Sequence, residues 1–197
     1  MKYQSVFDII GPVMIGPSSS HTAGAARIGR VARSIFGRQP KKAIITFYGS
    51  FANTYKGHGT DVAIVGGLLN FDTYDNRIID SLVIAKDLNI DVQFIASQEE
   101  TAHPNTAKIY LEDEQGTLEM IGVSVGGGKI DIIEIDGFQL KVSGNAPSIL
   151  VFHEDRYGVI ASVSNVLGKN EINIAYMEVA RKEKGSLALM VIETDQQ

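Results

Sequence analysis

The chain contains no cysteine among its 197 residues, and this absence limits what can hold the fold together. It excludes disulfide bonds, thiolate zinc sites, thiol nucleophiles and any iron–sulfur cluster bound through cysteines of this chain. The four histidines, His21, His58, His103 and His153, include no pair at the i, i+4 spacing of a helical zinc site. Because 44% of the residues are hydrophobic, the chain can instead bury a packed core. We expect no metal site formed by this chain alone.

The formal net charge is −5, from 18 Lys and Arg residues against 23 Asp and Glu residues. This balance provides no broad basic face, which disfavours nucleic-acid binding as the main role. No apolar run approaches the ~20 residues that span a bilayer. Residues 1–4 also lack the apolar core of a signal peptide. We therefore expect a cytoplasmic protein with no membrane segment.

The spacing of apolar residues changes near Ala146 and Pro147, where we place a boundary between domains of residues 1–146 and 147–197. In the first domain the periodicity predicts helices at residues 24–36, 60–69 and 78–88, and strands at 42–48, 90–96, 107–111, 118–125, 129–135 and 138–142. In the second it predicts a strand at 148–153, a helix at 159–167 and strands at 172–180 and 187–193. Because helices lead and strands close the first domain, the order of elements indicates an α+β fold rather than a doubly wound sheet.

A run of polar side chains leads directly into the first predicted helix: Ser18, Ser19, Ser20, His21 and Thr22. Backbone N–H groups at a helix start are unpaired and favour an anion, so a substrate carboxylate or phosphate would fit there. The alternative is an ordinary serine cap on the helix. One capping side chain would suffice for that role, so five polar side chains in a row favour a functional site.

His58 lies between Gly57 and Gly59, just before the helix predicted at 60–69. Glycine permits positive φ angles and close approach of the backbone to a ligand. An imidazole at such a position can accept a proton near neutral pH, as a catalytic base must. The spacing alone does not separate this interpretation from an exposed turn histidine.

Three further features are weaker candidates. Residues 103–105 (HPN) fit a turn before a strand. The glycines Gly126, Gly127 and Gly128 allow close approach of a ligand or a neighbouring chain, but no phosphate-loop Lys-Ser/Thr follows them. In the second domain, Gly158 would let backbone amides meet a small anionic effector at a helix start.

Taken together, these motifs resemble the beta chain of the bacterial iron–sulfur L-serine dehydratases. Five segments carry the resemblance in the family's order: residues 7–12 (FDIIGP), 16–22 (GPSSSHT), 57–61 (GHGTD), 103–105 (HPN) and 126–128 (GGG). The resemblance covers essentially the whole chain. In the two-chain form of that family, the cysteines that bind the [4Fe–4S] cluster lie on a separate alpha subunit, in keeping with a chain that has none.

The resemblance also implies the fold. The first domain is similar to the allosteric-substrate-binding domain of some phosphoglycerate dehydrogenases, a mixed α/β fold. The second is similar to an ACT domain, a ferredoxin-like βαββαβ module that usually binds amino acids. The predicted elements supply only its βαββ part, so we expect a C-terminally truncated ACT domain with an open sheet edge. Such an edge favours pairing with another copy, so the isolated chain is expected to be a homodimer.

For the site, the resemblance implies dehydration of L-serine to pyruvate and ammonia, with the cluster of the alpha subunit as the Lewis acid. His58 is then the base that removes the Cα proton, and Ser18, Ser19, Ser20, His21 and Thr22 hold the substrate carboxylate. Asn105 is expected to contact the substrate. Gly126, Gly127, Gly128 and Gly158 are possible effector contacts, and the effector site itself stays open between the two domains.

Two other functions remain open at this point. One is a regulatory subunit that binds serine but contributes no catalytic group. The other is a detached regulatory module of a phosphoglycerate dehydrogenase. Because no Gly-x-Gly-x-x-Gly fingerprint occurs, nicotinamide binding by this chain is not expected.

Overall fold

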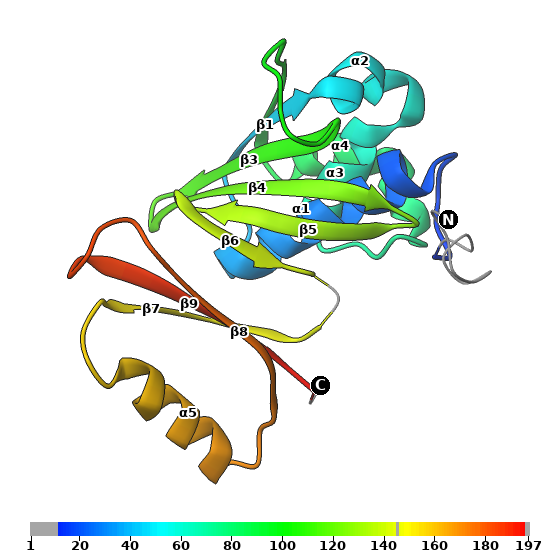
Figure 1. Ribbon diagram of the computed structural model, residues 1–197. Helices are drawn as coiled ribbons and strands as arrows, with labels where there is room; N and C mark the ends of the chain where they lie inside the picture. The colour runs from blue at the N-terminus through cyan, green and yellow to red at the C-terminus, as the bar shows by residue number, and fades with distance from the viewer. Residues whose placement is uncertain (1–11, 145, 196–197) are drawn as a thin grey trace.

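The computed structural model describes residues 12–144 and 146–195, which form two β-sheets and the helices that cover them (Figure 1). The larger sheet has the strand order β2–β1–β3–β4–β5–β6 and is antiparallel except for the parallel pair β1 and β2. Its strands are β1 (Lys42–Tyr48), β2 (Asp91–Ala96), β3 (Asn105–Asp113), β4 (Gly116–Gly126), β5 (Lys129–Ile135) and β6 (Phe138–Val142). The predicted α+β class is therefore confirmed.

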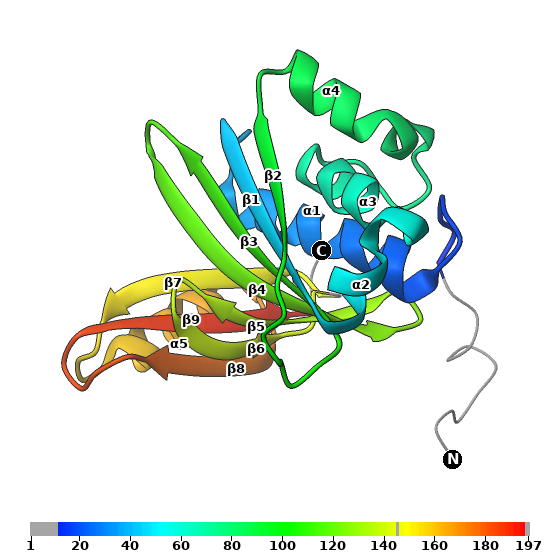
Figure 2. The ribbon, with the colours of Figure 1, turned by 90° about the horizontal axis from the view of Figure 1, so that it is seen from above.

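The helices of the first domain lie on one face of this sheet (Figure 2). They are α1 (Gly24–Phe36), α2 (Gly49–His58), α3 (Thr60–Leu68) and α4 (Ser81–Asp87), with a π-helical turn at Ser19–Ala23 and a 3-10 turn at Asn76–Asp80. Helix α1 ends at Gly37, whose φ of 76° lets its N–H bond to the Arg33 carbonyl. Alternate β3 residues such as Ile109 and Leu111 are fully buried beneath the helices.

Helices α1 and α3 cross so closely that each needs a glycine at the contact. A Cβ on Gly29 would lie 2.1 Å from the Ile64 carbonyl oxygen, and one on Gly67 would lie 2.0 Å from that of Ala26. No side chain larger than hydrogen fits at either position, since neither carbonyl can move without its helix. This contact fixes α1, which carries the polar run at its N-terminus.

The smaller sheet has the order β7–β9–β8, with strands β7 (Ser148–Glu154), β8 (Ile174–Arg181) and β9 (Leu187–Thr194), and helix α5 (Val159–Lys169) joins the first two. Strand β9 contributes Met190 and Ile192 to the cluster beneath α5. The alternate residues Leu189 and Val191 join the core of the first domain. The smaller sheet is thus packed between α5 and the larger domain.

All predicted strands and helices in the described residues are present, and their ends agree within two residues with one exception. The helix predicted at 78–88 begins at Ser81, because the residues before it form the 3-10 turn at Asn76–Asp80. The turn between β5 and β6 places Asp136 at φ 47° and Gly137 at φ 76°, as a tight hairpin requires. Helix α2 was not predicted. Strand β6 ends at Val142 and β7 begins at Ser148, and the boundary near residue 146 stays a prediction.

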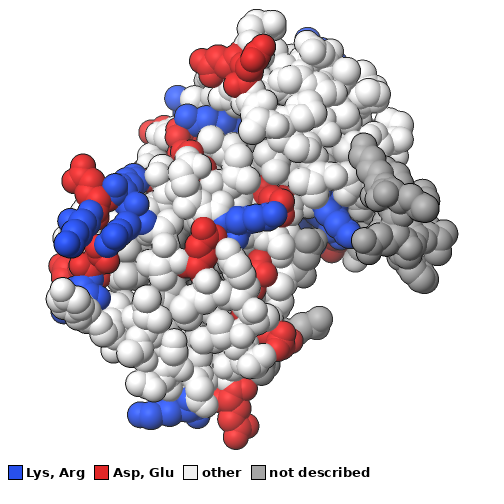
Figure 3. Space-filling view, in the orientation of Figure 1, with Lys and Arg blue, Asp and Glu red and all other residues white. Residues whose placement is uncertain are grey.

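Residues 7–11, part of the first segment of the resemblance, lie outside the described residues. Among the helices that the structure describes, none has the length and apolar character needed to cross a membrane. On the face in Figure 3, basic and acidic side chains are interspersed, so no large basic area forms there.

Candidate active site

The candidate site lies at the end of the larger sheet where β1 and β4 end and β3 and β5 begin. The π-helical turn at Ser19–Ala23 and helix α2 meet at this end, beside the tips of β4 and β5 (Figure 1). Two segments that are about thirty residues apart in the sequence are therefore in contact.

The serine run begins with a cap and continues as a tight turn. Ser18 caps it, because its Oγ accepts from the His21 N–H at 3.1 Å. The Ser18 carbonyl accepts from the N–H groups of Thr22 and Ala23 at 2.9 and 3.3 Å. The expected capping role is thus filled by Ser18 alone, and the hydroxyl of Ser20 is left to contact an imidazole.

His21 is held by hydroxyl groups on both sides of its ring. Its Nδ1 lies 3.3 Å from Ser20 Oγ and 3.5 Å from Ser18 Oγ. Its Nε2 lies 3.0 Å from Ser50 Oγ, on the first turn of α2. A hydroxyl can donate or accept, so either neutral tautomer of His21 is satisfied here.

His58 lies against His21, with ring centroids 4.8 Å apart. The Thr22 hydroxyl donates to the His58 carbonyl at 3.2 Å, which ties the end of α2 to the serine run. The Nδ1 atom of His58 is buried and has no hydrogen-bond partner among the described residues. The structure thus brings His58 into contact with the segment Ser18–Thr22.

The backbone around His58 differs from the prediction at one glycine. His58 is the last residue of α2, so Gly57 is helical and does not use a positive φ. Only Gly59 does, at φ 65°, where its N–H bonds to the Tyr55 carbonyl and ends the helix. The imidazole is therefore fixed by a helix end rather than by a flexible glycine turn.

The environment lowers the pKa of His21 from its ordinary value of 6.5. Burial is the main cause, because it disfavours the charged imidazolium, and repulsion from His58 adds to it. Both causes act in the same direction and favour the neutral form of the His21 imidazole.

Asn105 lies in the layer beneath these groups, at the start of β3. Its amide Nδ2 donates to the Ser124 carbonyl at 3.4 Å, while its Oδ1 is buried without a partner in the described part of the chain. Ser124 Oγ is also buried and unpartnered there, and it faces Gly24, where a Cβ would lie 2.1 Å from it. The close approach of α1 to β4 thus depends on Gly24.

The triple glycine borders this region through structural contacts. All three glycines have positive φ, and the Gly128 carbonyl accepts from Arg27 Nη1 at 3.0 Å. A Cβ on Gly128 would lie 2.7 Å from Pro12. Gly158 is elsewhere: it is exposed at φ 84° directly before α5 in the second domain. Helix α5 lies at the opposite end of the molecule from α2, the helix that His58 ends (Figure 1).

The described residues form no group of three or more His, Cys, Asp or Glu side chains that could hold a metal ion. With no cysteine in the chain, the donors here are imidazoles and hydroxyls. This set does not fit a [4Fe–4S] cluster, which needs thiolates. Any cluster that works with these residues must be bound by another chain.

A family model described as serine dehydratase beta chain matches residues 5–89, and an ACT domain model matches residues 148–197. The chain is 65% identical to the probable L-serine dehydratase beta chain of Bacillus subtilis over 196 residues, which cover 100% of this chain and 89% of that protein. It belongs to the serine dehydratase beta chain family. The L-serine dehydratase beta chain of Peptoniphilus asaccharolyticus is 38% identical over 99% of this chain and 89% of its own length.

A further similarity concerns the phosphoglycerate dehydrogenases. The D-3-phosphoglycerate dehydrogenase of Bacillus subtilis is 31% identical over 112 residues, which are 57% of this beta chain and 21% of that enzyme. The similarity to those enzymes therefore covers only part of each chain. The small domain of this beta chain family member is the ACT domain, as expected.

Ser50 is the contact that sequence analysis missed in this beta chain. It lies 29 positions beyond His21, outside the motifs that the patterns singled out. Its position follows from α2, whose first N–H groups, those of Ser50 and Phe51, donate to the Pro104 carbonyl at 2.7 and 3.3 Å. The HPN segment thus has a structural role in placing Ser50. The spacing of residues in the sequence does not reveal this contact.

Proposed function

We propose that this chain provides part of the active site of an L-serine dehydratase, which converts L-serine to pyruvate and ammonia together with an alpha subunit. The names of the two beta chains that match along its whole length support this activity. The observation that carries it is the His21–His58 pair, with rings 4.8 Å apart and hydroxyls around it. The proposed cofactor is a [4Fe–4S] cluster on the alpha subunit.

The reaction needs removal of a weakly acidic Cα proton and loss of hydroxide, a poor leaving group. A cluster iron bound by the partner would supply Lewis acidity to the substrate hydroxyl. This chain's own contribution is the proton transfer. We assign it to His58, because its Nδ1 makes no hydrogen bond within the described residues and the ring sits at a fixed helix end.

The substrate carboxylate is assigned to the segment Ser18–Thr22 and to Asn105. Hydroxyls and the N–H groups at the start of a helix are suitable donors for an anion. Their closeness to His58, through the Thr22 hydroxyl bond to the His58 carbonyl, would place the Cα of a bound serine within reach of the imidazole.

His21 is assigned a positioning role beside the base. Its lowered pKa keeps it neutral, so it does not raise the positive charge beside His58 at the start of proton transfer. The Ser50 and Ser20 hydroxyls hold the His21 ring at both nitrogens. A fixed neutral neighbour restricts the rotation of His58 without competing for its proton.

The test is reconstitution of the chain with its alpha subunit under anaerobic conditions, with pyruvate release as the readout. His58→Ala should lower kcat by ~10²–10⁴-fold, the usual contribution of a general base. His153→Ala is the matched control, since His153 lies on β7 and bonds only to the Glu154 carbonyl among the described residues. Both variants must still co-purify with the alpha subunit.

The alternative function is regulation, in which the chain senses serine but supplies no catalytic group. It predicts that His58→Ala keeps the maximal rate and changes only the dependence on serine concentration. An unchanged kcat with an intact complex would therefore overturn the catalytic proposal and support the regulatory one.

A further inference from the structure

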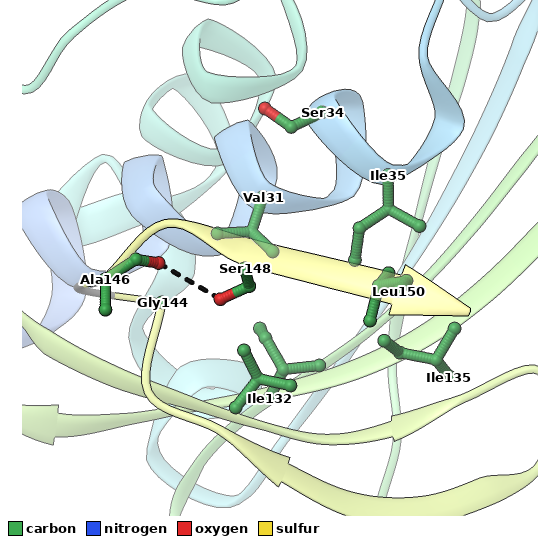
Figure 4. Close-up of a pocket in the computed structure, with 10 residues that line it drawn as sticks. Val31, Ser34, Ile35, Ile132, Ile135, Gly144, Ala146, Ser148 and Leu150 are labelled. Atoms are coloured by element: carbon green, nitrogen blue, oxygen red, sulfur yellow. Dashed lines mark hydrogen bonds between the residues drawn. The ribbon is translucent and has the colours of Figure 1, made fainter. Parts of the chain in front are cut away.

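A cavity of about 420 Å³ lies where the two domains meet (Figure 4). Its apolar walls come from four elements: α1, β5, β6 and β7, through Val31, Ile35, Ile132, Ile135, Val142 and Leu150. This volume is in the range of small-molecule sites, which are often found between domains and lined mainly by apolar side chains. Most of the side chains that line it are aliphatic, Ser34 and Ser148 are polar, and none carries an aromatic ring.

A polar recess of about 340 Å³ opens beside this cavity and shares Val31, Ser34 and Gly144 with it. The recess is lined by Arg27, Arg30 and Asp72, so it holds two guanidinium groups and one carboxylate. Arg30 Nη1 lies 2.6 Å from Asp72 Oδ2, and both side chains are about 40% exposed. The recess thus carries a net charge of +1 with groups of both signs at its surface.

We propose that the cavity and recess together bind a free α-amino acid with a branched aliphatic side chain. Its carboxylate would contact the arginines, which suit planar anions, and its ammonium would contact Asp72. Its side chain would enter the aliphatic cavity, where burying it removes apolar surface from water. Serine, with one hydroxyl and no aliphatic branch, fits this site poorly, so the site goes beyond the proposed substrate pocket.

Helix α1 connects this site to the histidine pair. Its N-terminus follows the serine run, and Val31, Ser34 and Ile35 line the cavity nearer its C-terminus. At 1.5 Å per residue, Arg27 lies roughly 8 Å and Ser34 roughly 18 Å beyond Thr22 along the helix. The cavity and the recess share no lining residue with the segment Ser18–Thr22 or with His58. The ligand would contact α1 and β7 at once, and would join the two domains.

The experiment is isothermal titration calorimetry of the purified full chain with L-leucine. L-leucine is expected to bind, and L-serine to bind at least about tenfold more weakly, since burying three more carbons contributes roughly 0.8 kcal/mol each. The probes 4-methylpentanoate and 3-methylbutylamine lack the ammonium and the carboxylate. Each should bind at least about tenfold more weakly, because each loses a charge-assisted hydrogen bond. If either probe binds as tightly as L-leucine, the assignment of a zwitterionic ligand is overturned.

Two variants locate the site independently. Ser34→Phe fills the shared boundary from an exposed position and should abolish the L-leucine signal, while Ser34→Ala should keep it. Arg30→Gln should weaken L-leucine about tenfold. Arg181→Gln, which removes an exposed arginine paired with Asp155 in the second domain, is the matched control. The proposal would be overturned if the folded chain does not bind L-leucine. It would also be overturned if Ser34→Phe and Arg30→Gln bind L-leucine as tightly as the unsubstituted chain does.

Discussion

The two domains of this chain are stabilised in different ways. In the first, six strands and four α-helices bury a continuous core, including Ile28, Ile64 and Ile109 with no exposed surface. In the described part of the second, the cluster beneath α5 has three buried members, Leu167, Met190 and Ile192. The ACT sheet places its other face, through Leu189 and Val191, on the core of the first domain.

This difference shows which domain can position catalytic groups. A module of about fifty residues buries a smaller share of its surface than a larger domain, so it is marginal alone. Here it gains stability from its neighbour, as the bonds from the backbone N–H groups of Lys141 and Ser143 to Glu178 and Glu193 also indicate. The histidine pair lies on the domain whose core is complete.

The largest expected effect tests the shared core. Leu189→Ala, on the β9 face toward the first domain, should lower the free energy of unfolding by about 2–5 kcal/mol, the usual result of emptying a buried leucine site. Val166→Ala on α5, where the side chain is 59% exposed, should change it by about 0.5 kcal/mol or less. Urea unfolding followed by circular dichroism measures both. Separate transitions for the two domains, with only the second shifted, would contradict the shared core.

The next effect contrasts a helical glycine in each domain. Gly67→Ala should destabilise the chain by about 1–3 kcal/mol or more, because the new methyl group would overlap the Ala26 carbonyl. Gly168→Ala in α5 meets no atom within 4 Å and should instead stabilise by about 0.5–1 kcal/mol. The opposite signs can be read from thermal unfolding. If both substitutions stabilise the chain, α1 and α3 are less tightly packed than the structure indicates.

A smaller effect concerns Ser50, which the first domain uses to hold His21. Ser50→Ala should lower kcat by about tenfold in the reconstituted enzyme, with serine KM nearly unchanged, if one hydrogen bond is lost from the pair. Ser50→Thr keeps the hydroxyl and should restore most of the rate. Ser162→Ala, at an exposed position of α5, is the control in the second domain. A loss of rate in Ser50→Thr as large as in Ser50→Ala would argue against the hydroxyl.

The smallest effect is the pH dependence of stability from His21. Because its folded pKa is below 6.5, the unfolded chain binds more protons as the pH falls below that value. His21 therefore reduces stability as the pH falls from 6.5 toward the lowered pKa, and has no such effect above it. His21→Asn should show a shallower decline in denaturant midpoint between about pH 7 and pH 5. If the denaturant midpoint of His21→Asn declines as steeply as that of the unsubstituted chain, or more steeply, His21 is not the group that causes the pH dependence.

Sequence patterns predicted the fold well because its elements have strong local signals. Strand β1 alternates buried and half-buried residues over Lys42–Tyr48, and the Asp136–Gly137 turn adopts the positive φ angles that its residue types favour. Helix α2 escaped prediction because Gly49, Asn53 and Gly57 are weak helix formers. It forms because Phe51 is fully buried and Pro104 accepts its first N–H groups.

The amino-acid sequence by itself determined that this chain supplies no cysteine ligand for a cluster, and where most strands begin and end. Residue type and short-range periodicity are sufficient for these conclusions. Only the tertiary structure decided that His21 and His58 are neighbours, that Ser50 contacts His21, and that residues of both domains line a mainly aliphatic cavity. These contacts join segments far apart in the chain, and they depend on how closely α1, α3 and the sheets pack.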